Sequence, residues 1–333
     1  MVSLPARPNM DQLRHQAKEL RRAAVAGNPE ALERLGAVSD GVTLATAQVA
    51  VARKYGYRSW AVLKSVVDAK AEAGAGALMP GKHRGDGIHG AADALGWAQS
   101  QGWTPGQLPI AAILTSQTFI TRYLEAFPDR FTSSSELTPT NGRVFLTVTE
   151  PVVAIACLGT GASAAVTHLE QLIGLGVKTF ICIGPAPAIS TALRWGDCVV
   201  ATAALRDDGI SQHYVEPARY AHPDPELTRT LAEHAAAEGL EPVLGPVWTV
   251  PTPYRTTAEE VDAYRAEGVL TTDLMTAAVF AVAGALGAKA ASASVATSTL
   301  GQPRGSAPPP ERTSRIFALL EVANRAAIAG SDR

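Results

Sequence analysis

The spacing of apolar residues divides the chain into a helical beginning and a longer region in which strands and helices alternate. In residues 9–73, Leu13, Ala17 and Leu20 recur at helical spacing before Gly27 ends the stripe. Three later helix starts are marked by a proline or by a capping side chain, at Pro29, Thr43 and Ser59. The pattern therefore predicts four short helices in this first part of the chain.

From about residue 92, short apolar runs alternate with segments of helical spacing. The predicted strands are residues 109–115, 143–149, 152–159, 178–184, 197–205, 244–250 and 289–296. The predicted helices are residues 117–126, 163–175, 225–238, 257–267, 273–286 and 311–328. Apolar strands separated by helices are typical of a mostly parallel sheet covered on both faces. The tight Thr-Glu-Pro connection at 149–151 favours a hairpin, so we expect a mixed sheet in an α/β fold.

Glycine-rich composition separates these two regions. Residues 73–91 hold many glycines, one proline and mixed charges, as linkers do. We therefore predict a helical N-terminal module at 1–73, a linker at 74–91 and an α/β domain at 92–330. A second stretch rich in proline and glycine, residues 301–311, precedes the last helix, and such loops either serve as lids or remain inert.

The overall composition limits the classes of protein to consider. With 333 residues, 47% hydrophobic and 18% charged, the chain has the composition of a compact globular protein. A net charge of −2 gives no reason to expect binding to nucleic acid or to an anionic membrane. The N-terminus lacks the apolar region of a signal peptide, and apolar runs are too short to span a bilayer. We expect a cytoplasmic protein without a membrane partner.

The cysteines and histidines do not indicate a metal site or a disulfide framework. Cys157, Cys182 and Cys198 all lie in apolar runs, without the paired spacing of metal ligands. His83 and His89 lie in the predicted linker, where solvated histidines are common. We expect buried reduced thiols at Cys157 and Cys198, no metal and no cofactor.

Two of the predicted strands end in polar turns, and α/β proteins usually hold their ligands at such strand ends. After strand 152–159 a glycine-rich turn opens a helix, which makes the first amides of the helix, at Gly161 and Ser163, candidates for binding an anion. After strand 197–205 the chain reads RDDGISQHY, which brings Arg206, His213 and Tyr214 into one loop. This loop is therefore a candidate ligand-binding segment.

Three stretches of the α/β domain carry a family resemblance. They read LGTGASAAVTHLEQLIGLGVKTFICIG, GDCVVATAALRDDGISQHYVEPARYAHPDPELTRTL and TPYRTTAEEVDAYRAEGVL. In order and spacing they resemble the nucleoside phosphorylase superfamily, in its uridine phosphorylase and purine nucleoside phosphorylase branch, over residues 108–300. The resemblance implies a three-layer αβα sandwich with a mixed, mostly parallel twisted sheet, usually in a homo-oligomer. It also implies cleavage of an N-glycosidic bond by phosphate.

The phosphate-binding groups that the resemblance implies are missing from this sequence. Cys182 and Pro185 stand where the family carries an arginine and a hydroxyl that hold phosphate, and Pro185 also lacks a backbone N–H. Ser116 and Gln117 stand in place of the family's first phosphate loop, with Arg122 as the candidate substitute for a cation. We therefore expect weak binding of phosphate.

The groups that would hold the nucleoside are altered as well. Met275 replaces a glutamate that the family uses for the ribose hydroxyls, and a thioether is a poor acceptor for them. Thr297 and Ser298 stand where a Ser-Asp pair serves purine bases. Losing one such contact typically costs about 10²–10³ in rate, so we expect negligible phosphorolysis from the whole set.

The candidate site residues form two groups. Asp273 and His213 are the candidate acid–base residues, and the predicted pocket consists of Cys182, Pro185, Arg206, Tyr214, Tyr254, Arg255, Met275, Thr297 and Ser298. Structural alternatives remain open for several of them. Asp273 opens the helix predicted at 273–286, where it would stabilise the N-terminus. Arg206 and Asp207 are able to form an ion pair, and His213 and Tyr214 to pack at a subunit interface.

These observations favour an enzyme whose pocket has been repurposed for a small, partly apolar ligand, such as a specialised metabolite. One alternative is a nucleoside phosphorylase or nucleosidase whose missing groups come from elsewhere, for instance from Arg122, His213 or a neighbouring subunit. The other is a catalytically inactive protein that binds a ligand or a protein partner. The sequence leaves all three open.

The N-terminal module has a resemblance of its own. The stretches RPNMDQLRHQAKELRRAAVAGNPEALERL and TLATAQVAVARKYGYRSWAVLKSVV resemble a helical segment found ahead of ankyrin repeats in bacterial proteins. No ankyrin repeat follows in this sequence. We expect the module to stabilise the chain or to dock a protein partner.

Overall fold

The computed structural model describes most of the chain. The described residues are 4, 9–36, 38, 41–74, 81–85, 87–100, 102, 104, 106, 108–130, 143–147, 153–157, 159–300 and 311–331. The chain divides into two compact units, Met1–Pro80 and Gly81–Arg333. Among the described helices, none has the length and apolar character needed to cross a membrane. Parts of the predicted linker, the connection at 149–151 and residues 301–310 lie outside the described residues.

The first unit contains the four helices that the apolar spacing predicted. They are α1 (Met10–Val25), α2 (Pro29–Gly36), α3 (Leu44–Lys54) and α4 (Trp60–Gly74). Asn9 caps α1 and Thr43 caps α3 through side-chain oxygens that accept backbone N–H groups. The predicted stripe Leu13, Ala17 and Leu20 is buried in the core of this unit. Helical spacing and capping residues were therefore sufficient to locate these elements.

The second unit is built on one mixed sheet, whose described strands agree closely with the predicted ones. They are β1 (Ala111–Thr115), β2 (Arg143–Leu146), β3 (Ala154–Cys157), β4 (Thr179–Ala188), β5 (Cys198–Arg206), β6 (Tyr220–Ala221), β7 (Val243–Thr249), β8 (Thr271–Asp273) and β9 (Lys289–Thr299). The short strands β6 and β8 were not predicted. Strands β2 and β3 pair antiparallel, as expected for a hairpin.

The strand order is β2-β3-β1-β4-β8-β7-β5-β6, and β9 lies between β4 and β5 by pairing with both. Five strands, β4, β8, β7, β5 and β9, therefore close into a ring, with a single residue pair, Ala188 and Thr271, joining β4 to β8. Strands β3, β1, β4 and β9 run parallel, so their C-terminal ends lie at one edge. That edge is where α/β sheets usually bind ligands.

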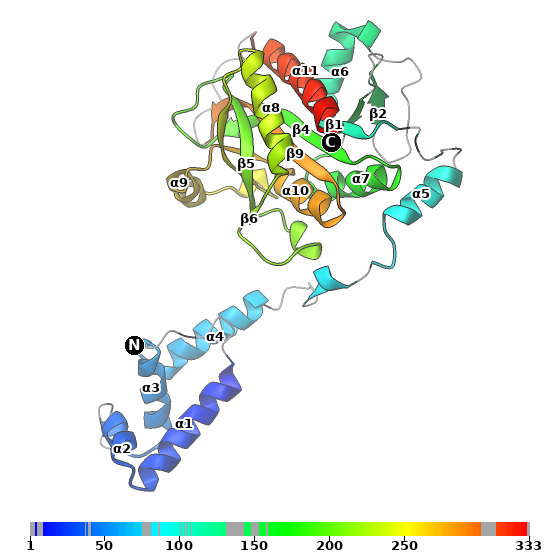
Figure 1. The fold of residues 1–333 in the computed structure, drawn as a ribbon. Helices are drawn as coiled ribbons and strands as arrows, with labels where there is room; N and C mark the ends of the chain where they lie inside the picture. The colour runs from blue at the N-terminus through cyan, green and yellow to red at the C-terminus, as the bar shows by residue number, and fades with distance from the viewer. Residues whose placement is uncertain are drawn as a thin grey trace. The chain divides into compact units, whose positions relative to one another are not determined.

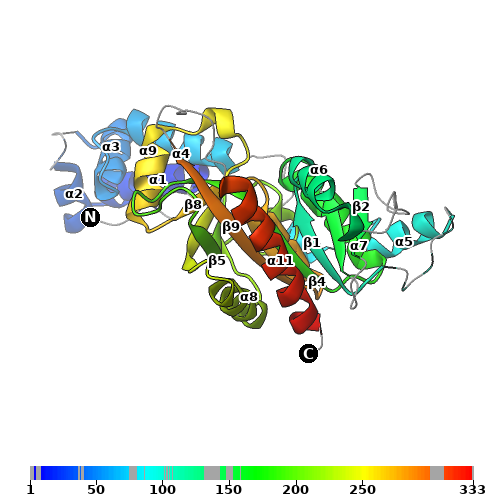
Figure 2. The same ribbon diagram turned by 90° about the horizontal axis from the view of Figure 1, so that it is seen from above.

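Helices cover both faces of this sheet, which confirms the predicted three-layer αβα arrangement (Figure 1). One face, here called the α7/α10 face, packs against α5 (Ala91–Ser100), α7 (Ala162–Gly174) and α10 (Thr276–Ala285). The opposite α8/α11 face packs against α6 (Gln117–Ala126), α8 (Pro225–Ala237) and α11 (Glu311–Ser331). Figure 2 shows α11 lying along β9. A further helix, α9 (Ala258–Ala266), packs through Val261 against a smaller core with Trp248.

Candidate functional site

The alternation of side chains along β4 decides which candidate residues share a surface. Phe180 and Cys182 belong to the core of the α7/α10 face, whereas Ile181 and Ile183 belong to the core of the α8/α11 face. Because successive residues of a strand point to opposite faces, Gly184 continues the row of Phe180 and Cys182. The candidate site at the strand end is therefore formed on the α7/α10 face.

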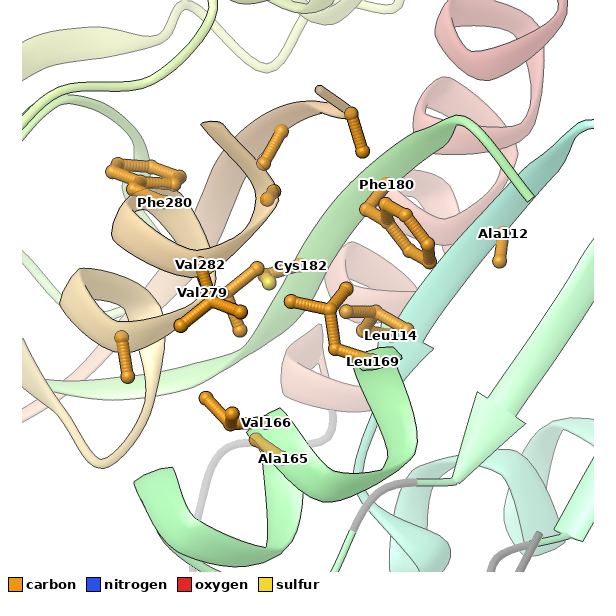
Figure 3. Close-up of a cluster of buried hydrophobic side chains, with 14 of the residues drawn as sticks. Ala112, Leu114, Ala165, Val166, Leu169, Phe180, Cys182, Val279, Phe280 and Val282 are labelled. Carbon is orange, nitrogen blue, oxygen red and sulfur yellow. The ribbon is translucent and has the colours of Figure 1, made fainter. Parts of the chain in front are cut away.

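Cys182 does not line an open pocket, which corrects the prediction from sequence. Its side chain is 2% exposed and packs in the core between β4 and the helices α7 and α10, near Leu169 and Val279 (Figure 3). Burial raises the pKa of the Cys182 thiol well above its usual range, and the charge of Asp273 raises it further. A buried thiol that resists ionisation is unsuited to act as a nucleophile.

Pro185 faces away from this surface, which corrects a second prediction. Its partner in the parallel register with β9 is Val295, and Val295 belongs to the core of the α8/α11 face. Partners in register share a face, so Pro185 lies on the face opposite to Cys182 and Gly184. It also lies beyond Cys182, the last residue of β4 that pairs with β1, and a proline is tolerated there because part of the ladder has ended.

Gly184 marks open space on the α7/α10 face, and sequence reasoning missed its role. A Cβ atom built on Gly184 would meet no atom within 4 Å. Its register partner on β9 is Ser294, which is also partly buried and has a hydroxyl to offer. Applying the two-residue period to β4 and β9 together would have pointed to this pair. Gly184 and Ser294 therefore form the floor of the candidate site.

Asp273 lies at the end of β8, and its carboxylate caps the next helix. The prediction that Asp273 opens a helix at 273 was wrong in detail, because α10 begins at Thr276. Its Oδ1 accepts hydrogen bonds from the backbone N–H of Met275 (2.7 Å) and of Thr276 (2.8 Å). It also accepts one from Oγ1 of Thr249 (3.0 Å), which in turn accepts the N–H of Ala277 (2.8 Å).

This cap has an electrostatic consequence for the site. Desolvation raises the pKa of Asp273, although hydrogen bonds from Thr276, Met275 and Thr249 act in the opposite direction. The amides of Met275 and Thr276 are bonded to this carboxylate and the amide of Ala277 is bonded to Thr249, so these donors at the start of α10 are not free for an external anion. Asp273 therefore works against phosphate binding at the N-terminus of α10.

The other candidates at the strand ends are partly accessible. Met275 directly precedes α10 and packs against the core of the α7/α10 face, while Thr297 and Ser298 lie partly buried near the end of β9. Thr276 brings α10 close to β9, because its Oγ1 lies 3.4 Å from Oγ of Ser292. The groups at the strand ends are therefore the hydroxyls of Thr297 and Ser298 and the thioether of Met275, which packs against the apolar core of the α7/α10 face.

The loop at 207–216 is fixed by its own hydrogen bonds. Asp208 Oδ1 accepts the N–H of Ile210 (2.8 Å) and of Ser211 (2.6 Å), and its Oδ2 accepts the Ser211 hydroxyl (2.8 Å). Arg206 donates from Nε to Ser211 Oγ (2.9 Å) and from a terminal nitrogen to the carbonyl of Glu216 (2.7 Å). Arg206 thus shapes the loop, and these bonds replace the expected ion pair with Asp207.

Asp207, Tyr214 and His213 have separate partners. Asp207 accepts a hydrogen bond from Nε1 of the buried Trp248 (3.2 Å), and desolvation raises the pKa of its carboxyl. Tyr214 donates to Glu170 of α7, and burial together with Glu170 raises the pKa of its hydroxyl. His213 is partly buried in the short 3₁₀ turn η3 (Ser211–His213), which packs beside α10. The loop therefore borders the candidate site.

Four remaining candidates are exposed and lie in three separate places of the fold. Tyr254, 96% exposed, and Arg255 belong to the 3₁₀ turn η4 (Pro253–Arg255). Arg122 is exposed on α6, which covers the α8/α11 face, whereas Ser163 is exposed at the start of α7 on the opposite face. The structure does not bring Arg122 together with Gly161 and Ser163, the proposed anion-binding turn.

The comparisons with known proteins agree with this architecture. A family profile described as "Phosphorylase superfamily" matches residues 110–329, about two thirds of the chain. The chain belongs to the phosphorylase superfamily. The match lies within the second unit and confirms the family that the three sequence stretches indicated.

Individual members of the phosphorylase superfamily match shorter stretches. A uridine phosphorylase from Haemophilus influenzae is 36% identical over 118 residues, which is 35% of this chain and 45% of the relative. A guanosine phosphorylase from Halorubrum lacusprofundi is 30% identical over 138 residues, 41% of this chain and 57% of the relative. The matched stretches therefore span about half the length of these relatives.

The second unit also contains a cavity outside the strand-end site. It has a volume of about 270 Å³ and lies between α6, β3 and α11. Tyr123, Arg130 and Glu321 in its lining are hydrogen-bonded to one another. It lies on the α8/α11 side, away from the floor at Gly184. Among the described residues no cluster of side chains has the composition of a metal site.

Proposed function

We propose that this member of the phosphorylase superfamily is an enzyme whose strand-end site takes a small, partly apolar ligand in place of phosphate and ribose. The observation that carries the proposal is that Asp273, the carboxylate of the site, is already hydrogen-bonded within the protein. Asp273 Oδ1 is committed to the N-terminus of α10, and the neighbouring Cys182 is part of the core. What remains open is the space at Gly184, whose register partner on β9 is Ser294, while Met275 packs against the core of the same face.

The chemistry of these groups favours ligands with an apolar body and a few polar atoms. Binding sites for small molecules are mostly apolar, with a small number of polar groups that fix orientation. A hydroxyl donates or accepts one hydrogen bond, and a thioether offers dispersion contacts, but neither neutralises a phosphate. The resemblance that places Cys182 and Met275 at phosphate- and ribose-binding positions supports the same proposal.

A second candidate function is cleavage of the N-glycosidic bond of a nucleoside. It is favoured by the names of the relatives, which are uridine and guanosine phosphorylases. For this function the missing cation would have to come from outside the strand-end site. The two candidates differ in one property, the ability of the site to hold inorganic phosphate.

Filling the space at Gly184 provides the test. A Gly184→Val variant is expected to fold with a free energy of unfolding within about 1 kcal/mol of the native protein, because a strand accepts valine and no atom stands in its way. Ligand-observed NMR would follow benzamide as an apolar carbonyl probe and the ³¹P line of inorganic phosphate. We expect saturation transfer to benzamide that the variant loses, and an unchanged phosphate line in both proteins.

The matched control is Gly245→Val, at a glycine where a Cβ would lie 2.6 Å from Cδ1 of Leu270. That variant should lose stability, which would show that the tolerance of valine is specific to the open space. Broadening of the phosphate line by the native protein that disappears in Gly184→Val would contradict the proposal and favour the nucleoside-cleaving alternative.

A further inference from the structure

The short 3₁₀ turn η1 (Lys82–Arg84) lies against the loop 207–216, and both belong to the second unit. Lys82 Nζ lies 2.8 Å from Nδ1 of His213, although the two residues are 131 positions apart in the chain. Lys82 lies in the segment 74–91 that the sequence pattern predicts to be a linker. The contact makes it part of the surroundings of a candidate acid–base residue.

A second set of contacts holds η1 in this place. Glu216, at the end of the loop, accepts a hydrogen bond from Nε of Arg84 (3.0 Å) and pairs with Nε2 of His83 (3.0 Å). The backbone carbonyl of Glu216 also accepts the bond from Arg206. One residue thus ties η1 to the hydrogen-bond network that shapes the loop. The exposed pair of Arg84 and Glu216 contributes little to stability, so its effect is on position.

The chemistry of the Lys82 contact determines which nitrogen of His213 carries the proton. A lysine ammonium group donates hydrogen bonds and cannot accept them. A nitrogen 2.8 Å from it must therefore offer a lone pair, so Nδ1 is unprotonated and the ring proton of neutral His213 resides on Nε2. The hydrogen bond at one ring nitrogen in this way fixes the role of the other.

We propose that Lys82 is a positioning residue for His213, which holds the imidazole in the Nε2–H form so that the ring offers a hydrogen-bond donor beside α10. The role in ligand binding rests on the proposed function of the strand-end site. A donor on His213 would bind a ligand that carries a hydrogen-bond acceptor, such as a carbonyl oxygen or a ring nitrogen. The form of the ring itself depends only on the contact with Lys82.

The test measures the ¹⁵N chemical shifts of the histidine ring nitrogens by ¹H–¹⁵N correlation with the protons on the ring carbons. The sample is the whole chain without ligand. At a pH of about 8.5 imidazole is neutral and each form has a distinct pair of ¹⁵N shifts. The sequence has seven histidines, and the signal that disappears in His213→Gln identifies the ring of interest. We expect a single Nε2–H form for His213 in the native protein, with an Nδ1 shift displaced by hydrogen bonding.

Two substitutions of Lys82 separate the outcomes. Lys82→Arg keeps a donor and should leave the His213 shifts nearly unchanged. Lys82→Glu replaces the donor with an acceptor, which should move the proton to Nδ1 and exchange the shifts of the two nitrogens. Spectra of Lys82→Glu that match the native protein would overturn the proposal, even if benzamide binds as expected. Conversely, the exchange of shifts would stand if the ligand experiments at Gly184 failed.

Discussion

Replacing Asp273 with alanine is expected to lower the free energy of unfolding by about 2–4 kcal/mol. The substitution removes the acceptor for the amide of Met275, for the amide of Thr276 at the start of α10, and for the hydroxyl of the fully buried Thr249. Loss of a helix cap typically costs about 0.5–2 kcal/mol, and a buried donor left without a partner about 1–3 kcal/mol. Urea unfolding followed by circular dichroism would measure the loss.

Two further variants show whether the cap is the cause. Asp224→Ala removes the cap of α8, where the side chain accepts a single amide, from Leu227, so a smaller loss of about 1 kcal/mol is expected. Asp273→Asn keeps an oxygen at Oδ1 and should unfold within about 1 kcal/mol of the native protein. An alanine variant as stable as the native protein would show that Asp273 does not hold α10, and would leave its carboxylate available for a ligand.

The difference in stability between the native protein and Asp273→Asn is expected to depend on pH. Because burial raises the pKa of Asp273 above its unfolded value, the folded state binds the proton more tightly than the unfolded state. This contribution to stability is complete below the ordinary carboxyl pKa of about 4 and is lost as the pH rises through the raised value. The stability of the native protein relative to Asp273→Asn should therefore fall as the pH rises above about 4.

Introducing an arginine at position 182 is expected to destabilise the protein by more than about 4 kcal/mol. The resemblance to nucleoside phosphorylases implies an arginine here, but the structure surrounds the position with apolar side chains of β4, α7 and α10 (Figure 3). Burying a long charged side chain in a packed core combines overpacking with the cost of desolvating a charge. Chemical unfolding and the yield of soluble protein would measure the effect.

Two control variants show whether the loss of stability comes from changing residue 182 or from introducing an arginine. Cys182→Ala should lose only about 1 kcal/mol, as expected for one small buried group. Thr167→Arg, on the exposed side of α7, should change stability by no more than about 0.5 kcal/mol. A stable Cys182→Arg variant that gains affinity for phosphate would mean that residue 182 faces a ligand, and the account of this face would have to be abandoned.

The fold was predictable because its elements repeat simple patterns over many residues. The four helices of the first unit follow from apolar spacing and from caps such as Thr43. The short strand β8 was missed because three residues are too few to show a period. Helix α5 was missed because Gly96 interrupts a weak apolar pattern, and β4 was ended too early because glycine and proline usually mark strand ends.

The site was less predictable because it depends on direction and on partners far along the chain. The sequence places Cys182 and Pro185 in one strand, but only the register with β9 shows that they point to opposite faces. The sequence leaves Asp273 either as an acid–base residue or as a residue that stabilises the start of a helix, and the choice depends on contacts such as the one with Thr249, 24 residues earlier. The contact between Lys82 and His213 joins two distant loops and leaves no periodic signal.

Release of free base from uridine, inosine and adenosine, measured with and without inorganic phosphate, tests the central claim most directly. The claim is that the strand-end site lacks the groups that hold phosphate and ribose, since Asp273 caps α10 and Cys182 is buried. We predict that added phosphate will leave the rate of base release at the level of the protein-free control for all three nucleosides. A rate that rises and saturates with phosphate concentration would contradict the account and identify a nucleoside phosphorylase.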